Sequence, residues 1–68
     1  MNTLYKEILS NLMVIENEED PIVRMIAYAK IGGIVEYGIA KEDIEEEIAK
    51  KIMNAVVKAI SSCIDQLV

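Results

Sequence analysis

The side chains best suited to chemistry in this 68-residue chain are carboxylates, and they cluster. Five of them fall within six residues, at Glu42, Asp43, Glu45, Glu46 and Glu47. In a helix, two carboxylates four residues apart share a face and could hold Mg²⁺, but only loosely. Acidic groups at a helix start also stabilise the helix dipole, and Glu46 and Glu47 each stand four residues before a lysine. We therefore predict a solvated cluster at a helix start and no metal site.

Side chains for nucleophilic or acid–base catalysis are scarce. The chain has no His and one cysteine, Cys63, which lies among apolar residues instead of the positive surroundings that activate a thiol. Ser61 and Ser62 have no His or Lys at a spacing that would activate a hydroxyl group. A single cysteine also excludes a disulfide scaffold within the chain. We therefore predict a protein without catalytic activity, and we assign no catalytic, cofactor-binding or metal-binding residue.

Composition and charge exclude several classes of protein. Apolar residues make up 53% of the chain, which is too many for a disordered protein. Seven basic and 12 acidic residues give a net charge of −5, so we expect no nucleic-acid partner. No window of about 18 residues lacks charge, and Met1 to Lys6 does not resemble a signal peptide, so we expect no membrane partner and a cytoplasmic location. Abundant Lys and Glu are typical of proteins from hot environments.

Hydrophobic periodicity predicts an all-α fold. We expect one domain over residues 1–68 with three helices, over about residues 3–15, 21–37 and 41–67. Asp20 and Pro21 predict the start of the second helix, because Asp caps free N–H groups and Pro suits the first helical position. Gly38 predicts the end of that helix, since glycine accepts the left-handed conformation at a helix end.

The second predicted helix has no polar face. Arg24, Lys30 and Glu36 lie roughly 120° apart around its axis. Because the remaining positions are apolar or small, we expect this helix to be buried on all sides. The same three charges are the polar residues that a ligand-binding or catalytic core could use.

Two glycines, Gly32 and Gly33, interrupt the helical pattern of this segment, each at a cost of roughly 1 kcal/mol relative to alanine. Ala29 and Gly33 are four residues apart and present a smooth face. We therefore predict that a neighbouring helix packs closely against Ala29, Gly32 and Gly33, with a kink as the alternative explanation. A phosphate-binding loop is not indicated, because no GK[ST] sequence follows.

One segment resembles a known repeat family. Asp20-Pro21-Ile22-Val23-Arg24, followed by Ala27, Ile31-Gly32 and Ile34, is similar to the turn and second helix of a HEAT-type repeat. The amphipathic segment from Leu4 to Ile15 stands where the first helix of that repeat would be. The resemblance covers at most residues 4–38, and the second repeat that normally stabilises such folds is missing. It implies a helical hairpin and a protein-binding role.

The third predicted helix is the longest. At 1.5 Å per residue it spans about 40 Å, against about 25 Å for the second, so it should extend past its neighbour by about ten residues. Its C-terminal half carries more apolar surface than one buried face requires. Because a large exposed apolar patch is uncommon on a soluble monomer, we predict a homo-oligomer, specifically a dimer. The predicted interface residues are Val56, Ala59, Ile60, Cys63, Ile64 and Leu67.

These observations favour a small homo-oligomeric interaction or adaptor protein, whose partners are a second copy of itself and another protein. The first alternative is a DNA-binding transcription or plasmid-type regulator, with part of a helix-turn-helix within Pro21–Gly38. The absence of a basic face disfavours it. The second alternative is a small ligand carrier or enzyme that uses Arg24, Lys30 and Glu36.

Overall fold

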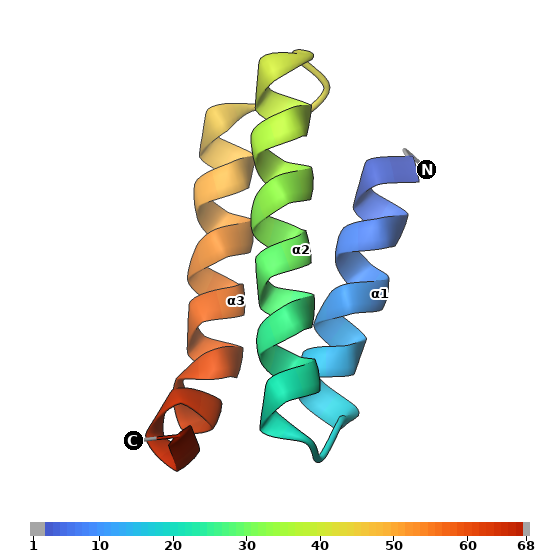
Figure 1. Ribbon diagram of the computed structural model, residues 1–68. Coiled ribbons are helices and arrows are strands. Elements are labelled where there is room, and N and C mark those ends of the chain that lie inside the picture. Colours follow the sequence, from blue (N-terminus) through green and yellow to red (C-terminus); the bar gives the residue numbers. More distant parts are fainter. Residues whose placement is uncertain (1–2, 68) are drawn as a thin grey trace.

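Three helices make up most of the part of the chain that the computed structural model describes, residues 3–67, with side chains for residues 3–61 and Asp65. They are α1 (Thr3–Asn17), α2 (Pro21–Ala40) and α3 (Glu46–Leu67). Residues 3–67 contain no strand, which confirms the predicted all-α fold. Figure 1 shows α2 between the other two helices, with successive helices antiparallel. Both α1 and α3 pack mainly against α2 and contact each other less.

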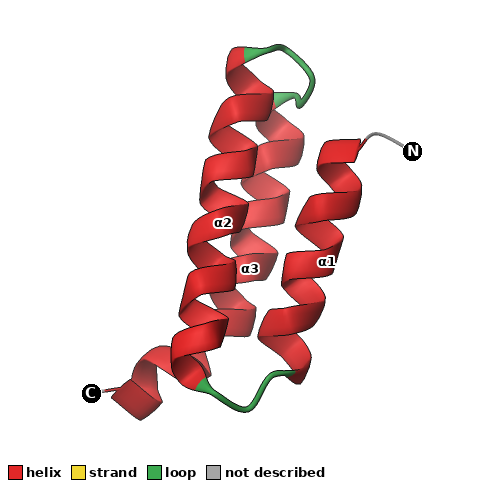
Figure 2. Ribbon diagram, turned by 45° about the vertical axis from the view of Figure 1, so that its right-hand side comes forward, coloured by secondary structure: helices red, strands yellow, loops and turns green. Residues whose placement is uncertain are grey.

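The start of α2 is the one that the sequence predicts. The Asp20 carboxylate accepts a hydrogen bond from the Ile22 backbone N–H at 2.9 Å, and Pro21 occupies the first helical position. This contact satisfies one of the free N–H groups of the first turn. The short loop before α2, residues 18–20, therefore sets the direction in which this helix starts. Figure 2 shows this loop and the loop at residues 41–45 at opposite ends of the molecule.

The end of α2 differs from the prediction. The helix passes through Gly38 without a break and ends at Ala40, and the residue with a left-handed backbone is Glu42, at φ 60°. The chain then turns back, and the N–H groups of Asp43 and Ile44 donate to the Gly38 carbonyl at 2.8 and 3.1 Å. Because residues 41–45 form this loop, α3 begins at Glu46 and not at Lys41.

Gly38 has a packing role in place of the predicted capping role. A Cβ atom at this position would lie 2.6 Å from Cγ1 of Ile44, which is closer than real Cβ atoms approach another carbon. Ile44 is only 3% exposed although it lies in a loop. The missing side chain of Gly38 therefore lets the loop place Ile44 in the core at this end of the molecule.

The core is apolar and is built by all three helices and the second loop. Among the described residues, no polar or charged side chain is buried. Four side chains are almost fully buried, Ile15, Ile31, Val56 and Ile60. The buried hydrophobic side chains among the described residues are those of Ile8, Ile15, Ala27, Ile31, Val35, Ile44, Ala49, Val56 and Ile60. Burial of such side chains is the main stabilising contribution in a chain of this size.

Arg24 ties the three helices together at the other end. Its guanidinium donates from Nε to the Ile15 carbonyl at 2.7 Å and from Nη2 to the Ala59 carbonyl at 3.0 Å. Arg24 lies near the start of α2, so its hydrogen bond to the Ala59 carbonyl shows which part of α3 lies beside the start of α2. By this register α3 passes the start of α2 by roughly five residues, and not by the predicted ten.

Candidate functional site

One side of α2 is apolar and uncovered. Ile22, Ile26, Ala29, Gly33 and Tyr37 recur every three or four residues and form what we call the outer face of α2. Ile22 is 62% exposed, Ile26 52% and Tyr37 55%. Ala29 and Gly33, between them, are also exposed. The expectation that α2 is buried on all sides is therefore wrong, because α1 and α3 cover only its inner side.

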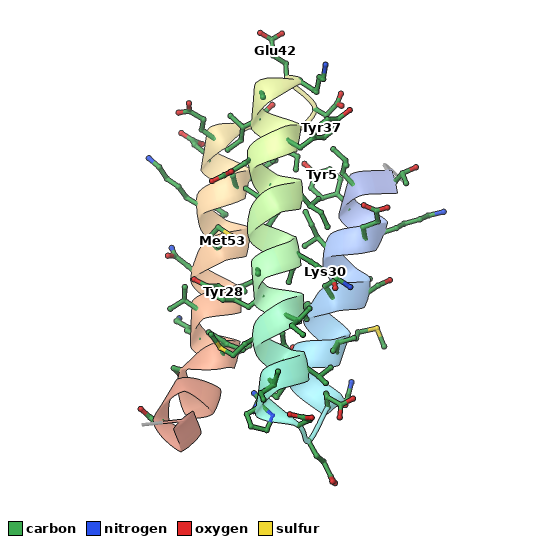
Figure 3. The ribbon with its side chains drawn as sticks, viewed as in Figure 1. Tyr5, Tyr28, Lys30, Tyr37, Glu42 and Met53 are labelled. Carbon is green, nitrogen blue, oxygen red and sulfur yellow. The ribbon has the colours of Figure 1, made fainter. Side chains whose placement is uncertain are left out.

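The three charges of α2 do not come together. Arg24 is half-buried and bonds to backbone carbonyls, whereas Lys30 and Glu36 are both exposed. Lys30 lines the groove between α1 and α2, and Figure 3 shows it with Tyr37 on the α1 side of α2. Glu36, by its helical position, lies on the opposite edge of the outer face. These three residues therefore do not form one polar cluster in the core.

The predicted close packing at the glycines is also absent within the described chain. No atom of a neighbouring helix or side chain lies within 4 Å of the position that a Cβ would take at Gly32 or at Gly33. Ala29 is exposed, and α2 continues through both glycines as α-helix. The space in front of Gly33 is open, so this chain does not itself supply the helix that the smooth face would admit.

The predicted interface on α3 is only partly available. Val56 and Ile60 are 0% and 1% exposed, so the chain's own core covers them and a partner could not reach them in this conformation. Ala59 is half-buried. Cys63, Ile64 and Leu67 lie outside the described side chains. Helical periodicity shows that a stripe is apolar but does not show which element covers it. The sequence therefore does not distinguish an interface position from a core position at Val56 and Ile60.

Shallow grooves follow the helix boundaries. One groove of about 700 Å³ runs between α1 and α2 and borders the outer face at Gly33 and Tyr37. Polar side chains from α1 line its other wall: Lys6, Glu7, Ser10 and Asn11. A second groove of about 300 Å³ between α1 and α3 is lined mainly by apolar side chains, with Leu9 50% exposed beside it. Both grooves are open at the surface, so neither encloses a small molecule.

The acidic cluster does not gather into a metal site. Glu42, Asp43 and Glu45 lie in the loop, and only Glu46 and Glu47 belong to the first turn of α3, where they favour the helix dipole. Among the described residues, no group of three or more potential ligands from Cys, Asp or Glu is placed to hold a metal ion. The same residues include no helix that is both long enough and apolar enough to cross a membrane.

Comparison with known proteins finds no relative of this chain. No family model matches the chain, and no curated protein or solved structure is significantly similar to it. The resemblance of residues 4–38 to a HEAT-type repeat is therefore not supported as family membership. The outer face of α2 is the feature on which a functional inference can be built.

Proposed function

We propose that this protein is a small interaction protein whose working form is a homodimer, joined through the outer face of α2. The observation that carries the proposal is the exposure of Ile22, Ile26 and Tyr37, each more than half exposed along one side of a single helix. Isolated exposed apolar side chains are common on protein surfaces, whereas several that gather along one helix face favour an interaction site. The chain contains no other described surface where three such residues share one helix face.

The size of the chain also supports association. In a chain of fewer than about 70–80 residues, one hydrophobic core supplies only a few kcal/mol of stability. Disulfides cannot add to it, because the chain has one cysteine. Covering the outer face of α2 with a partner would bury apolar surface that the fold leaves in water.

A second copy suits this face because its composition is self-complementary. The stripe has large side chains at both ends and small ones, Ala29 and Gly33, in its middle. Lys30 and Glu36 lie at its edges, so two such faces can meet along their middle without burying either of these charges. At the C-terminal end of the stripe, the Lys41 ammonium lies 5.9 Å from the centre of the Tyr37 ring. A two-fold axis through the stripe makes the same residues contact each other and closes the assembly as a dimer.

The test compares two substitutions of equally exposed apolar residues on different faces. Ile26, 52% exposed, lies in the outer face, and Leu9, 50% exposed, lies beside the α1–α3 groove. We expect sedimentation equilibrium to show a dimer for the wild type over roughly 10 µM to 1 mM, a monomer for Ile26→Asp and an unchanged dimer for Leu9→Asp. A wild-type monomer throughout this range would contradict the proposal, as would a dimer that Leu9→Asp dissociates and Ile26→Asp does not.

A further inference from the structure

Gly33 lies at the centre of the outer face, where the fold does not require a glycine. Its Cβ position is open, with nothing within 4 Å, and its backbone is helical without a positive φ. Glycine is the poorest helix former after proline, so any residue other than proline would favour the helical conformation of α2 more. The reason for a glycine here therefore lies outside the contacts of a single chain. Gly32 is equally open, but it lies about 100° around the helix from Gly33.

The small area of the outer face indicates why the absence of a side chain at Gly33 would matter for an interface. The outer face runs along α2 from Ile22 to Tyr37, so it is about 23 Å long and about 10 Å wide, or roughly 230 Å² in projection. A stable interface usually needs about 800 Å² from each partner. Two α2 helices at an ordinary distance would fall short of this area. If the helices approach closely at Gly33, the flanking side chains of the α1–α2 groove, such as Lys6 and Ser10, also come within reach of the partner.

The two charges at the edges distinguish the possible orientations of such a pair. Lys30 lies on the α1 edge of the outer face and Glu36 on the opposite edge. In an antiparallel two-fold pair, the same edge of both copies falls on one side, so Lys30 meets Lys30 of the partner subunit. In a parallel two-fold pair the edges alternate, and Lys30 lies on the same side as Glu36 of the partner subunit. Opposite charges that flank an apolar seam favour the parallel orientation.

We infer that the ligand of this surface is a second copy of the chain in parallel orientation, with the two α2 helices closest at Ala29 and Gly33. The inference rests on the proposed homodimer and adds its contact point and its orientation. The small residues set the distance between the helices, Ile22, Ile26 and Tyr37 fill the space on either side, and Lys30 pairs with Glu36 of the partner subunit.

The contact point is tested with Gly33→Leu, and Gly32→Leu is the matched control. Both substitutions add the same side chain to α2 at an open position, so both variants should melt at or above the wild-type temperature at low concentration. In sedimentation equilibrium we expect Gly33→Leu to raise the dissociation constant at least about tenfold and Gly32→Leu to change it less than about twofold. Equal effects of the two substitutions would overturn the contact point.

The orientation is tested by reversing the edge charges. Lys30→Glu and Glu36→Lys should each raise the dissociation constant about fivefold, because each places like charges together, and the double variant should return it to the wild-type value. Single variants that dimerise as the wild type does would overturn the parallel orientation. If the wild type dimerises and Ile26→Asp dissociates it, but neither test here gives its expected result, this inference fails and the proposed function stands. If the wild type is a monomer, both fail.

Discussion

Substitution of each of the three glycines of α2 by alanine adds one Cβ atom and so tests how closely the chain is packed at that position. Gly32, Gly33 and Gly38 all lie in the same helix, and none has a positive φ. Alanine should therefore gain roughly 1 kcal/mol of helix propensity at each site. At Gly32 and Gly33 nothing opposes this gain, because the Cβ position is open.

At Gly38 the gain is opposed by a collision. The new Cβ would lie 2.6 Å from Cγ1 and 3.3 Å from Cβ of Ile44, which is 3% exposed and has little room to move. Overpacking of this kind costs about 1–3 kcal/mol. Gly38→Ala should therefore leave the free energy of unfolding unchanged or lower it by up to about 2 kcal/mol, whereas Gly33→Ala should raise it by about 1 kcal/mol.

Urea unfolding followed by circular dichroism at low protein concentration measures these differences without a contribution from association. Between Gly33→Ala and Gly38→Ala we expect a separation of about 1–3 kcal/mol, or roughly 5–20 °C in Tm. In an Ile44→Ala background the collision with Cγ1 and Cδ1 is removed and only the 3.3 Å approach to the Cβ of residue 44 remains, so Gly38→Ala should become stabilising. Equal stabilisation by Gly38→Ala and Gly33→Ala in the otherwise wild-type chain would refute the contact between Gly38 and Ile44.

Two further predictions concern Arg24 and DNA. Arg24→Met keeps much of the side-chain volume but removes the hydrogen bonds from the guanidinium to the carbonyls of Ile15 and Ala59. Urea unfolding should therefore show a loss of about 1–3 kcal/mol, and Arg24→Lys should recover part of it. Because the net charge is −5, a mobility-shift assay at low salt should show no binding of duplex DNA, and micromolar binding that weakens steeply with added salt would restore the DNA-binding alternative.

Local signals in the sequence predicted much of the fold. Asp20 and Pro21 carry a start signal that depends only on adjacent residues, and the structure places the Asp20 cap and Pro21 where it predicts them. The end of α2 could not be predicted in the same way. Gly38 resembles a helix stop in sequence, yet its role depends on Ile44, which reaches it only after the chain has turned back at residues 41–45.

The length of α3 was overestimated for a related reason. The acidic residues from Glu42 to Glu47 have good spacing for a first helical turn, and Ile44 continues the apolar stripe of Ile48 and Ile52. In the structure, however, Ile44 is buried from a loop and not from a helix. A buried isoleucine fits either arrangement, so the apolar pattern alone does not distinguish a longer helix from a loop that returns to the core.

The candidate surface was missed because apolar periodicity identifies what must be covered but not which chain covers it. Because apolar residues occur all around α2, the sequence predicted a helix that its own chain encloses. However, α2 has only two neighbouring helices, α1 and α3, and both pack on its inner side. A helix surrounded on all sides needs more neighbours than a three-helix chain provides. This conflict is visible in the sequence itself, because the pattern predicts only three helices and one of them has no polar face. In the proposed homodimer, a second copy of α2 against Ile22, Ile26 and Tyr37 would supply the missing neighbour, and the stripe that the fold leaves exposed would become the core of the dimer.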